Sequence, residues 1–299
     1  MANVKELRVR IKSVGNIRQI TKAMEMVASM KLRKVQARAQ ANRPYTEEVR
    51  GLVGRLASSS GSEERQPLFE KREQKTIGVF VITSDRGLCG AYNSKLLANL
   101  EAEIERLKTE FPQSKLKFYC YGRKGYAYLT RRKHDVEKYF VEPPLDKADF
   151  AAAKHVSTAI VADFLAGKID SMHLCYTRFA SMIRFVPTFE TFLPVTSQAP
   201  QKLGSNPEKG RHYSADYLIE PDSATIFGLL LPRYLETLVY DSIVQSLASE
   251  HASRRMAMKG ATDAATRMSK ELKTEYNRAR QESITKELLD IIGGASAVS

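Results

Sequence analysis

The first forty residues carry apolar side chains at helical spacing. They fall in two quartets, each with a 3-4-3 spacing that lines a narrow seam rather than a broad face. The quartets are Val4, Leu7, Ile11 and Val14, then Ile17, Ile20, Met24 and Val27. Because the step from Val14 to Ile17 is three positions rather than four, we expect a phase slip in any supercoil at that point. No proline occurs before Pro44, so the pattern predicts one helix to about Leu56, roughly 80 Å long at 1.5 Å per residue.

The middle of the chain changes to the pattern of an α/β domain. Residues 76–82 (TIGVFVI) form a continuous apolar run, typical of a strand buried on both faces. Further strands are predicted at 116–121, 136–140, 171–177 and 183–193, and helices at 91–110 and 148–166. This alternation predicts a small, largely parallel sheet whose last two strands form an antiparallel hairpin. Polar stretches at 58–66 and 197–210 are interpreted as linkers.

A second long helix is predicted from about Ala224 to Ile292, with Pro232 in an early turn or at a kink. A lone narrow-seam helix is only marginally stable, so we expect the terminal helices to wind around each other as an antiparallel coiled coil. Two separate helices packed on the globular domain are the alternative. The predicted divisions are an N-terminal coiled-coil helix, a Rossmann-like α/β domain, a loop and a C-terminal coiled-coil helix, at 1–57, 75–195, 196–210 and 211–299.

The net charge of +13 is concentrated at one end of the chain. Residues 1–43 contain eleven Lys and Arg but only two acids, Glu6 and Glu25, a balance of +9. Such a segment indicates an acidic partner, whether nucleic acid, anionic lipid or an acidic protein surface. A nucleic-acid-binding protein is therefore an alternative interpretation, although residues 1–44 offer no aromatic side chain for base stacking. No apolar run is long enough to cross a bilayer and charges interrupt any signal-peptide core, so we expect the chain to stay where it is made.

No motif predicts catalysis. The segment SDRGLCG (84–90) lies between a strand and a helix, where phosphate loops occur, but it has only a GxxG spacing and no P-loop lysine. We interpret it as a tight turn, with Asp85 accepting local backbone hydrogen bonds rather than acting as a general base. The five histidines show no metal spacing, and Cys89, Cys120 and Cys175 are expected to be buried free thiols. We therefore expect no enzyme activity, no cofactor and no metal site.

Four segments resemble the signature segments of the γ subunit of F-type ATP synthases. They are IRQITKAMEMVASMKLRK (17–34), SDRGLCGAYN (84–93), SEHASRRMAMKGATDAATRM (249–268) and YNRARQESITKELLDIIGGA (276–295). The resemblance runs in order through almost the whole chain. It implies a coiled coil that stands inside the ring of α and β subunits, and an α/β domain that lies with the ε subunit on the c ring.

The resemblance also implies a function. Ion flow turns the c ring and the shaft, and the asymmetric shaft drives the catalytic β subunits through different conformations. The expected activity of the complex is proton-driven ATP synthesis and its reversal, ATP hydrolysis. The chain itself is expected to be a non-catalytic central stalk, present in one copy and peripheral to the cytoplasmic face of the bacterial plasma membrane. No nucleic-acid partner is implied.

Contact residues follow from the same resemblance. Met24 in KAMEMVA lies where the family's helix faces the acidic catch loop of the β subunit, with Lys22 and Lys31 placed to meet its acids. Arg280 and Gln281 in ARQESIT, a segment that also contains Thr285, match the family's polar contact with that catch region. The stretch Leu288–Val298 is implied to turn as a bearing inside an apolar sleeve. By pattern alone, Met24 is a core methionine and Arg280 a solvated charge.

Two positions depart from the family pattern. Gly260 stands at an alanine-like position, which costs about 1 kcal/mol of helix propensity. Ala264 stands where the family often has asparagine, so one polar contact is weakened. The cysteine-bearing regulatory insert of the chloroplast version and a transit peptide are both lacking, which indicates a bacterial-type protein without thiol control.

Overall fold

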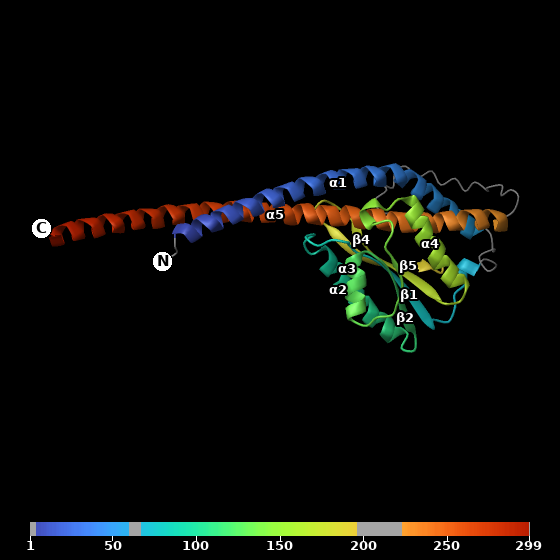
Figure 1. The fold of residues 1–299 in the computed structure, drawn as a ribbon. Coiled ribbons are helices and arrows are strands. Elements are labelled where there is room, and N and C mark those ends of the chain that lie inside the picture. The colour runs from blue at the N-terminus through green and yellow to red at the C-terminus, as the bar shows by residue number, and fades with distance from the viewer. Residues whose placement is uncertain (1–3, 60–66, 196–222, 299) are drawn as a thin grey trace. The chain divides into compact units, whose positions relative to one another are not determined.

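The computed structural model describes residues 4–59, 67–195 and 223–298 (Figure 1). The chain divides into two compact units, one made of residues 1–31 with 254–299 and the other of residues 32–253. Two long helices contribute to both units: α1 (Val4–Ser59) and α5 (Ser223–Val298). They run antiparallel, as Figure 1 shows, and the predicted pairing of the N- and C-terminal helices is confirmed.

In the smaller unit, a seam of buried side chains on α1 repeats every seven residues. Its members are Leu7, Val14, Thr21 and Ala28, all at most 8% exposed. The facing helix α5 contributes buried Met258 and Ala265. Between them the hydroxyl of Thr262 donates a hydrogen bond to the Thr21 hydroxyl across the pair, at 2.8 Å. The seven-residue repeat and the polar pair at its centre are typical of a coiled-coil seam.

The second predicted quartet of seam residues is wrong, and so is the phase slip. Ile17, Ile20 and Val27 are 51%, 60% and 47% exposed, and Met24 is half-buried. The first quartet is correct in phase, because Leu7 and Val14 are buried and Val4 and Ile11 half-buried. The repeat simply continues at seven residues through Thr21, whose hydroxyl has a partner on α5 and can therefore be buried at little cost.

The larger unit contains a five-stranded sheet in the order β3-β2-β1-β4-β5. The strands are β1 (Thr76–Ile82), β2 (Lys115–Tyr121), β3 (Val136–Phe140), β4 (Ser171–Phe179) and β5 (Phe185–Leu193). The first four strands are parallel to one another, and β5 pairs with β4 as an antiparallel hairpin. This confirms the predicted largely parallel α/β sheet with its terminal hairpin.

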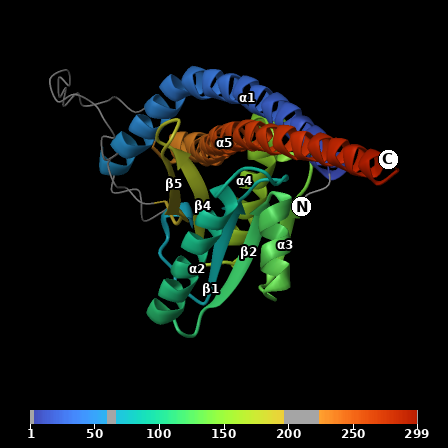
Figure 2. The same ribbon diagram turned by 90° about the vertical axis from the view of Figure 1, so that its left-hand side faces the viewer.

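Helices cover both faces of this sheet (Figure 2). Helix α2 (Tyr92–Glu110) and the short α3 (Arg123–Arg131) pack on one face, around Ile77, Val79 and Val81 of β1. Helix α4 (Phe150–Leu165) covers the other face together with the parts of α1 and α5 that belong to this unit. Burial on both sides explains why β1 is apolar at successive positions. Helix α3 was not predicted from the sequence.

Two predicted linkers lie largely outside the described residues. Of the stretch 58–66, residues 58 and 59 still belong to α1, and the rest is not described; nor is 197–210. Pro44 and Pro232 both lie inside helices. Gly260 is exposed on α5, and a Cβ atom built on it meets no other atom within 4 Å. In this chain, therefore, the glycine costs helix propensity without serving a close contact.

Candidate functional site

The carboxyl edge of the parallel strands is where ligands bind in open α/β sheets, but here the chain's own loop fills it. The loop that follows β1 is held by Asn93, whose side-chain oxygen accepts from the Ser84 amide and whose nitrogen donates to the Ser84 hydroxyl, at 3.1 and 2.7 Å. The Ser84 hydroxyl in turn donates to the carbonyl of Arg86 at 2.8 Å. These bonds give the polar side chains of Ser84 and Asn93, in the SDRGLCGAYN segment, a structural role.

The same loop also caps α3. The amides of Arg123, Lys124 and Gly125 donate to the Asp85 carboxylate, the Ser84 carbonyl and the Thr83 hydroxyl, at 3.1, 3.1 and 2.7 Å. Because these first-turn amides are already satisfied, this helix start has no free donors to offer a phosphate.

Asp85 is a backbone acceptor, as predicted, but its partners are distant in sequence. Its second carboxylate oxygen accepts from the amide of Leu145 at 3.0 Å. Gly122 allows the end of β2 to pass close to Thr83 at the end of β1. Its φ of 109° is in the region that favours glycine, and a Cβ there would lie 2.1 Å from the Thr83 carbonyl oxygen.

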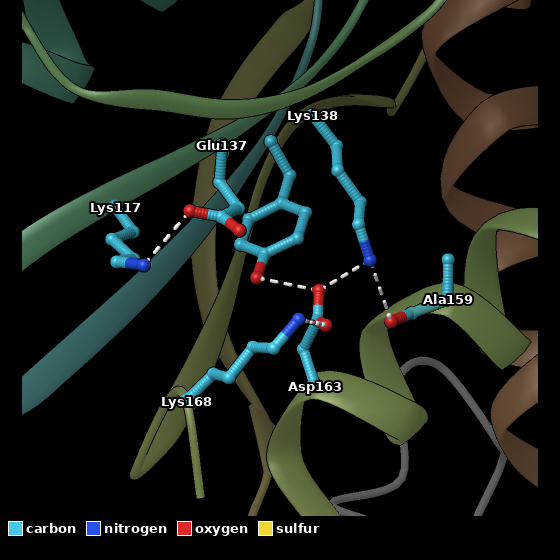
Figure 3. Close-up of polar contacts among 7 residues, drawn as sticks. Lys117, Glu137, Lys138, Ala159, Asp163 and Lys168 are labelled. Carbon is cyan, nitrogen blue, oxygen red and sulfur yellow. Dashed lines mark hydrogen bonds and ion pairs between the residues drawn. The ribbon is translucent and has the colours of Figure 1, made fainter. Parts of the chain in front are cut away.

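A buried carboxylate lies between the sheet and α4 (Figure 3). Asp163 is 3% exposed and accepts hydrogen bonds from the Tyr119 hydroxyl at 3.0 Å and from the ammonium groups of Lys138 and Lys168. Burial acts to raise the pKa of Asp163, but the hydrogen bonds from Lys138, Lys168 and Tyr119 outweigh it and hold the pKa below its ordinary value. Since its three donors are all side chains of the same domain, we interpret this cluster as structural.

The first group of predicted contact residues lies on α1. Lys22 is exposed, and its ammonium group forms an ion pair with the Glu25 carboxylate at 3.1 Å. Met24 and Lys31 are half-buried. The three positions span about two and a half turns of one helix, so they present a continuous stretch of α1 rather than a pocket.

The second group lies farther along α5. Arg280, Gln281 and Thr285 are exposed, and the Thr285 hydroxyl donates to the carbonyl of Gln281 at 3.0 Å within the helix. Arg280 lies eighteen residues beyond Thr262, about 27 Å along the helix at 1.5 Å per residue. Because Thr262 pairs with Thr21, next to Lys22, the two groups lie at different levels of the helix pair and do not form one site.

The end of α5 is apolar and exposed. Four large side chains there are 54% to 67% exposed: Leu288, Leu289, Ile291 and Ile292. The backbone of the implied bearing stretch is helical as far as Val298. An apolar end of this kind indicates a surface that a partner covers.

Polar residues on the buried side of α5 were not predicted from the sequence. A signal was present, because Ser242, Ser246, Ser249 and Ser253 recur at steps of four, three and four residues. The last three of these serines bond to the sheet domain, whereas Ser242 bonds within α5. All four serines are at most 8% exposed.

Within the described parts of the chain, no helix combines the length and apolarity needed to span a membrane. Nor do the described residues contain a group of three or more His, Cys, Asp or Glu side chains arranged to hold a metal ion. The three cysteines are buried free thiols, as predicted.

Known proteins resemble the chain along its whole length. A family model described as ATP synthase matches residues 3–298. The ATP synthase gamma chain of Cupriavidus pinatubonensis is 40% identical over 302 residues, and that of Dehalococcoides mccartyi is 40% identical over 304. In both comparisons the match covers 100% of this chain and 100% of the relative.

Solved structures show the same fold at lower identity. The central stalk and c-ring structure of the Tetrahymena thermophila mitochondrial ATP synthase contains a chain with a TM-score of 0.58 and 23% identity, covering 81% of this chain and 99% of that one. A chain of the Euglena gracilis mitochondrial enzyme, in a structure of OSCP, F1 and c-ring, has a TM-score of 0.65 and 17% identity, covering 99% and 94%. The family model and the full-length relatives show that the chain belongs to the ATP synthase gamma-chain family, and the solved structures share its fold.

Proposed function

We propose that this chain is a non-catalytic rotor, which couples proton flow through a c ring to conformational cycling of catalytic β subunits. The observation that carries the proposal is the exposed end of α5. From Ile284 to Ile292 every described side chain is exposed, although several are large and apolar. A helix without a packed face is only marginally stable in water, so this end needs a partner that surrounds it. A sleeve at the top of the α and β ring fits that need.

The charge of α1 supports an acidic partner. The helix exposes Arg8, Lys12 and Arg18. The two acids of its basic segment, Glu6 and Glu25, already form ion pairs with Arg10 and Lys22 within the helix. Exposed cations such as Arg8, Lys12 and Arg18 can therefore meet anionic groups of another molecule. Acidic loops of the β subunits are the partner that family membership favours over nucleic acid.

The contact roles of the predicted site residues form part of this proposal. Met24 supplies an apolar contact to the β catch loop, and Lys22 and Lys31 meet its carboxylates. The Lys22–Glu25 pair is a surface pair, which is worth at most about 1 kcal/mol, so the lysine can exchange partners at little cost. Arg280, Gln281 and Thr285 make polar contacts at a second level of the shaft.

The rest of the assembly follows the family. We propose α, β and ε subunits and the c ring as partners, with one copy of this chain per complex, held peripherally at the cytoplasmic face of the bacterial plasma membrane. The solved relatives come from one structure of a central stalk with its c-ring and from another of OSCP, F1 and a c-ring. The filled carboxyl edge of the sheet supports the absence of a nucleotide site in this chain, because Asp85 and Thr83 occupy donors that a phosphate would use.

The test is coupling in membrane vesicles that contain the complete ATP synthase. Met24→Lys should lower ATP-driven proton pumping several-fold more than ATP hydrolysis, because it places a cation against the catch loop. The matched control is Met26→Lys, since residue 26 is also on α1 but about 200° around the helix from residue 24.

Two results would contradict the proposal. Equal ratios of pumping to hydrolysis in parent and Met24→Lys complexes would remove the catch role from Met24. Purification of the chain from its own cells with nucleic acid, and without α and β subunits, would remove the rotor function itself.

A further inference from the structure

The strand β4 extends beyond its neighbour β1. The two strands are paired only as far as Val81 and Cys175, whereas β4 continues to Phe179 with β5 on its other side. In an antiparallel pair, the amide and carbonyl of one residue point to the same side, and residues two apart share that side. The backbone groups of Thr177 and Phe179 at this free edge therefore need partners from elsewhere.

Helix α5 supplies those partners. The Ser249 hydroxyl donates to the Thr177 carbonyl at 3.1 Å, and the Ser246 hydroxyl accepts from the Thr177 amide at 3.4 Å. The Gln245 side-chain oxygen accepts from the Phe179 amide at 3.1 Å. Side chains of a helix thus take the place of the missing strand along the edge of β4, where Figure 1 shows α5 passing beside it.

One turn farther along, α5 also holds the loop after β1. The Ser253 hydroxyl donates to the carbonyl of Cys89 at 2.6 Å. We call these four α5 residues the polar row: Gln245, Ser246, Ser249 and Ser253. At 100° per residue they fall within an arc of about 100° over some 12 Å of helix, so they form one continuous strip against the sheet domain.

An apolar strip of α5 lies beside the polar row and includes Val239, Ile243 and Leu247, all buried in the core. Apolar contacts are non-directional, so they hold the helix against the domain without fixing its rotation about its own axis. Hydrogen bonds do fix it. A rotation of about 20° moves an oxygen some 4–5 Å from the helix axis by roughly 1.5 Å, which is enough to break a hydrogen bond.

We propose that the polar row sets the rotational phase of α5 against the sheet domain, so that torque passes between domain and shaft without slip. The inference rests on the proposed rotor function and adds the residues that stiffen the joint, by which we mean the contact between α5 and the sheet domain. These are positioning residues, since none of them meets a reacting group. A purely structural role would make them contribute to stability but not to torsional stiffness.

The experiment measures that stiffness in the assembled F1 complex of this chain with its own α and β subunits. A rod-shaped probe is attached to the sheet domain through Lys108→Cys, on the exposed side of α2. The native cysteines of this chain are buried, so labelling the chain before it is assembled with the α and β subunits directs the probe to the new thiol. With the complex stalled by bound ADP, the angular variance of the probe reports the compliance of the joint.

The double variant Ser249→Ala and Ser253→Ala removes two of the four polar contacts and should raise the angular variance about two-fold or more. The matched control is Ser242→Ala. Ser242 is equally buried, at 1% exposed, but its hydroxyl donates to Val239 of its own helix at 2.8 Å. It should leave the variance unchanged. Ser253→Thr keeps the hydroxyl and should restore the parent value relative to Ser253→Ala.

The outcomes separate the joint from the rotor function. If the parent complex shows no ATP-driven rotation of the probe, the rotor function itself fails. If the parent rotates and the double variant has the parent's variance, the phase-setting role is overturned, even if the variant melts at a lower temperature. Equal broadening by Ser242→Ala overturns it as well. Should the double variant not assemble, Ser249→Ala and Ser253→Ala are measured singly against the same control.

Discussion

Two buried tyrosines of the sheet domain offer a matched test of what a hydroxyl group contributes. Tyr119 is fully buried, and its hydroxyl donates to the Asp163 carboxylate at 3.0 Å. Tyr92 is 3% exposed, and within the described residues its hydroxyl makes no hydrogen bond of ordinary geometry, although Ser246 and Thr177 are its polar neighbours. Replacement by phenylalanine removes the same atom in both cases, so the difference between the variants isolates the hydrogen bond.

The expected magnitudes follow from the partners. A hydrogen bond to a charged group is worth about 1.5–3 kcal/mol. The Asp163 carboxylate keeps Lys138 and Lys168 as donors in the variant, so we expect the lower end, about 1.5–2 kcal/mol, for Tyr119→Phe. Tyr92→Phe should be neutral or stabilise the protein by up to about 1 kcal/mol, because it removes a buried polar atom that makes no hydrogen bond of ordinary geometry.

Urea unfolding of the purified chain, followed by circular dichroism, measures both effects. With a slope of about 2 kcal/mol per M, Tyr119→Phe should lower the midpoint by about 1 M, while Tyr92→Phe should not lower it. Hydrogen exchange should localise the loss to β2 and α4. The reasoning is refuted if the two variants shift the midpoint equally, or if Tyr92→Phe is the more destabilising.

The pH dependence gives a second check on the same cluster. Because the pKa of Asp163 is lowered in the folded state, the unfolded chain binds more protons near pH 4. Its contribution to stability is therefore complete above about pH 4 and is lost as the pH falls through the folded pKa. The penalty of Tyr119→Phe should shrink over the same range, since a neutral carboxyl group is a weaker acceptor. A penalty that is constant down to pH 2 contradicts this account.

Three further predictions address other parts of the chain. Burial, and to a smaller extent the positive charge of the nearby Arg106, lowers the pKa of His173 to about 4. The parent should therefore lose stability as the pH falls from about 6.5 to 4, because the unfolded chain binds the proton first. In acid titrations His173→Phe should remove on the order of 1–2 kcal/mol of that loss, a value reduced because the ring is partly exposed. In a double-mutant cycle with valine, Thr21 and Thr262 should show a coupling of about 1 kcal/mol by thermal unfolding, and no coupling would mean that their hydrogen bond does not contribute. Gly260→Ala should raise the unfolding free energy by up to about 1 kcal/mol, because the added methyl group meets no neighbour.

The sheet was predictable because its physical signal is local. An apolar run such as TIGVFVI, followed by turn residues and a helical pattern, is interpretable within about twenty residues. The role of Asp85 was predictable only in kind. Its partners at Arg123 and Leu145 are 38 and 60 residues away, and no local pattern identifies them. The short helix α3 was missed because it has only nine residues and its buried side contributes only Gly125 and Leu129.

The seam of α1 shows why apolarity alone misplaces a buried face. Ile17 and Ile20 are apolar but exposed, whereas Thr21 is polar but 8% exposed. The deciding quantity is whether a polar group finds a partner after burial, and Thr21 finds one on α5. One heptad position of α1 is occupied by Leu7, Val14, Thr21 and Ala28. To recognise it from the sequence, threonine has to be accepted as a seam residue. The exposed isoleucines then remain available for a surface outside the chain.

Hydroxyl groups at helix interfaces recur in both units, and they give the helices something that apolar contacts cannot. Leucine against leucine tolerates small rotations and translations, because dispersion and burial change gradually with position. A serine or threonine hydroxyl bonded at 2.6–3.1 Å, as at Thr262, Ser249 and Ser253, tolerates shifts of only a few tenths of an ångström. A helix that carries torque needs a defined rotational phase more than it needs additional binding energy. The same argument explains why these interfaces keep hydroxyls at positions where larger apolar side chains would bury more surface.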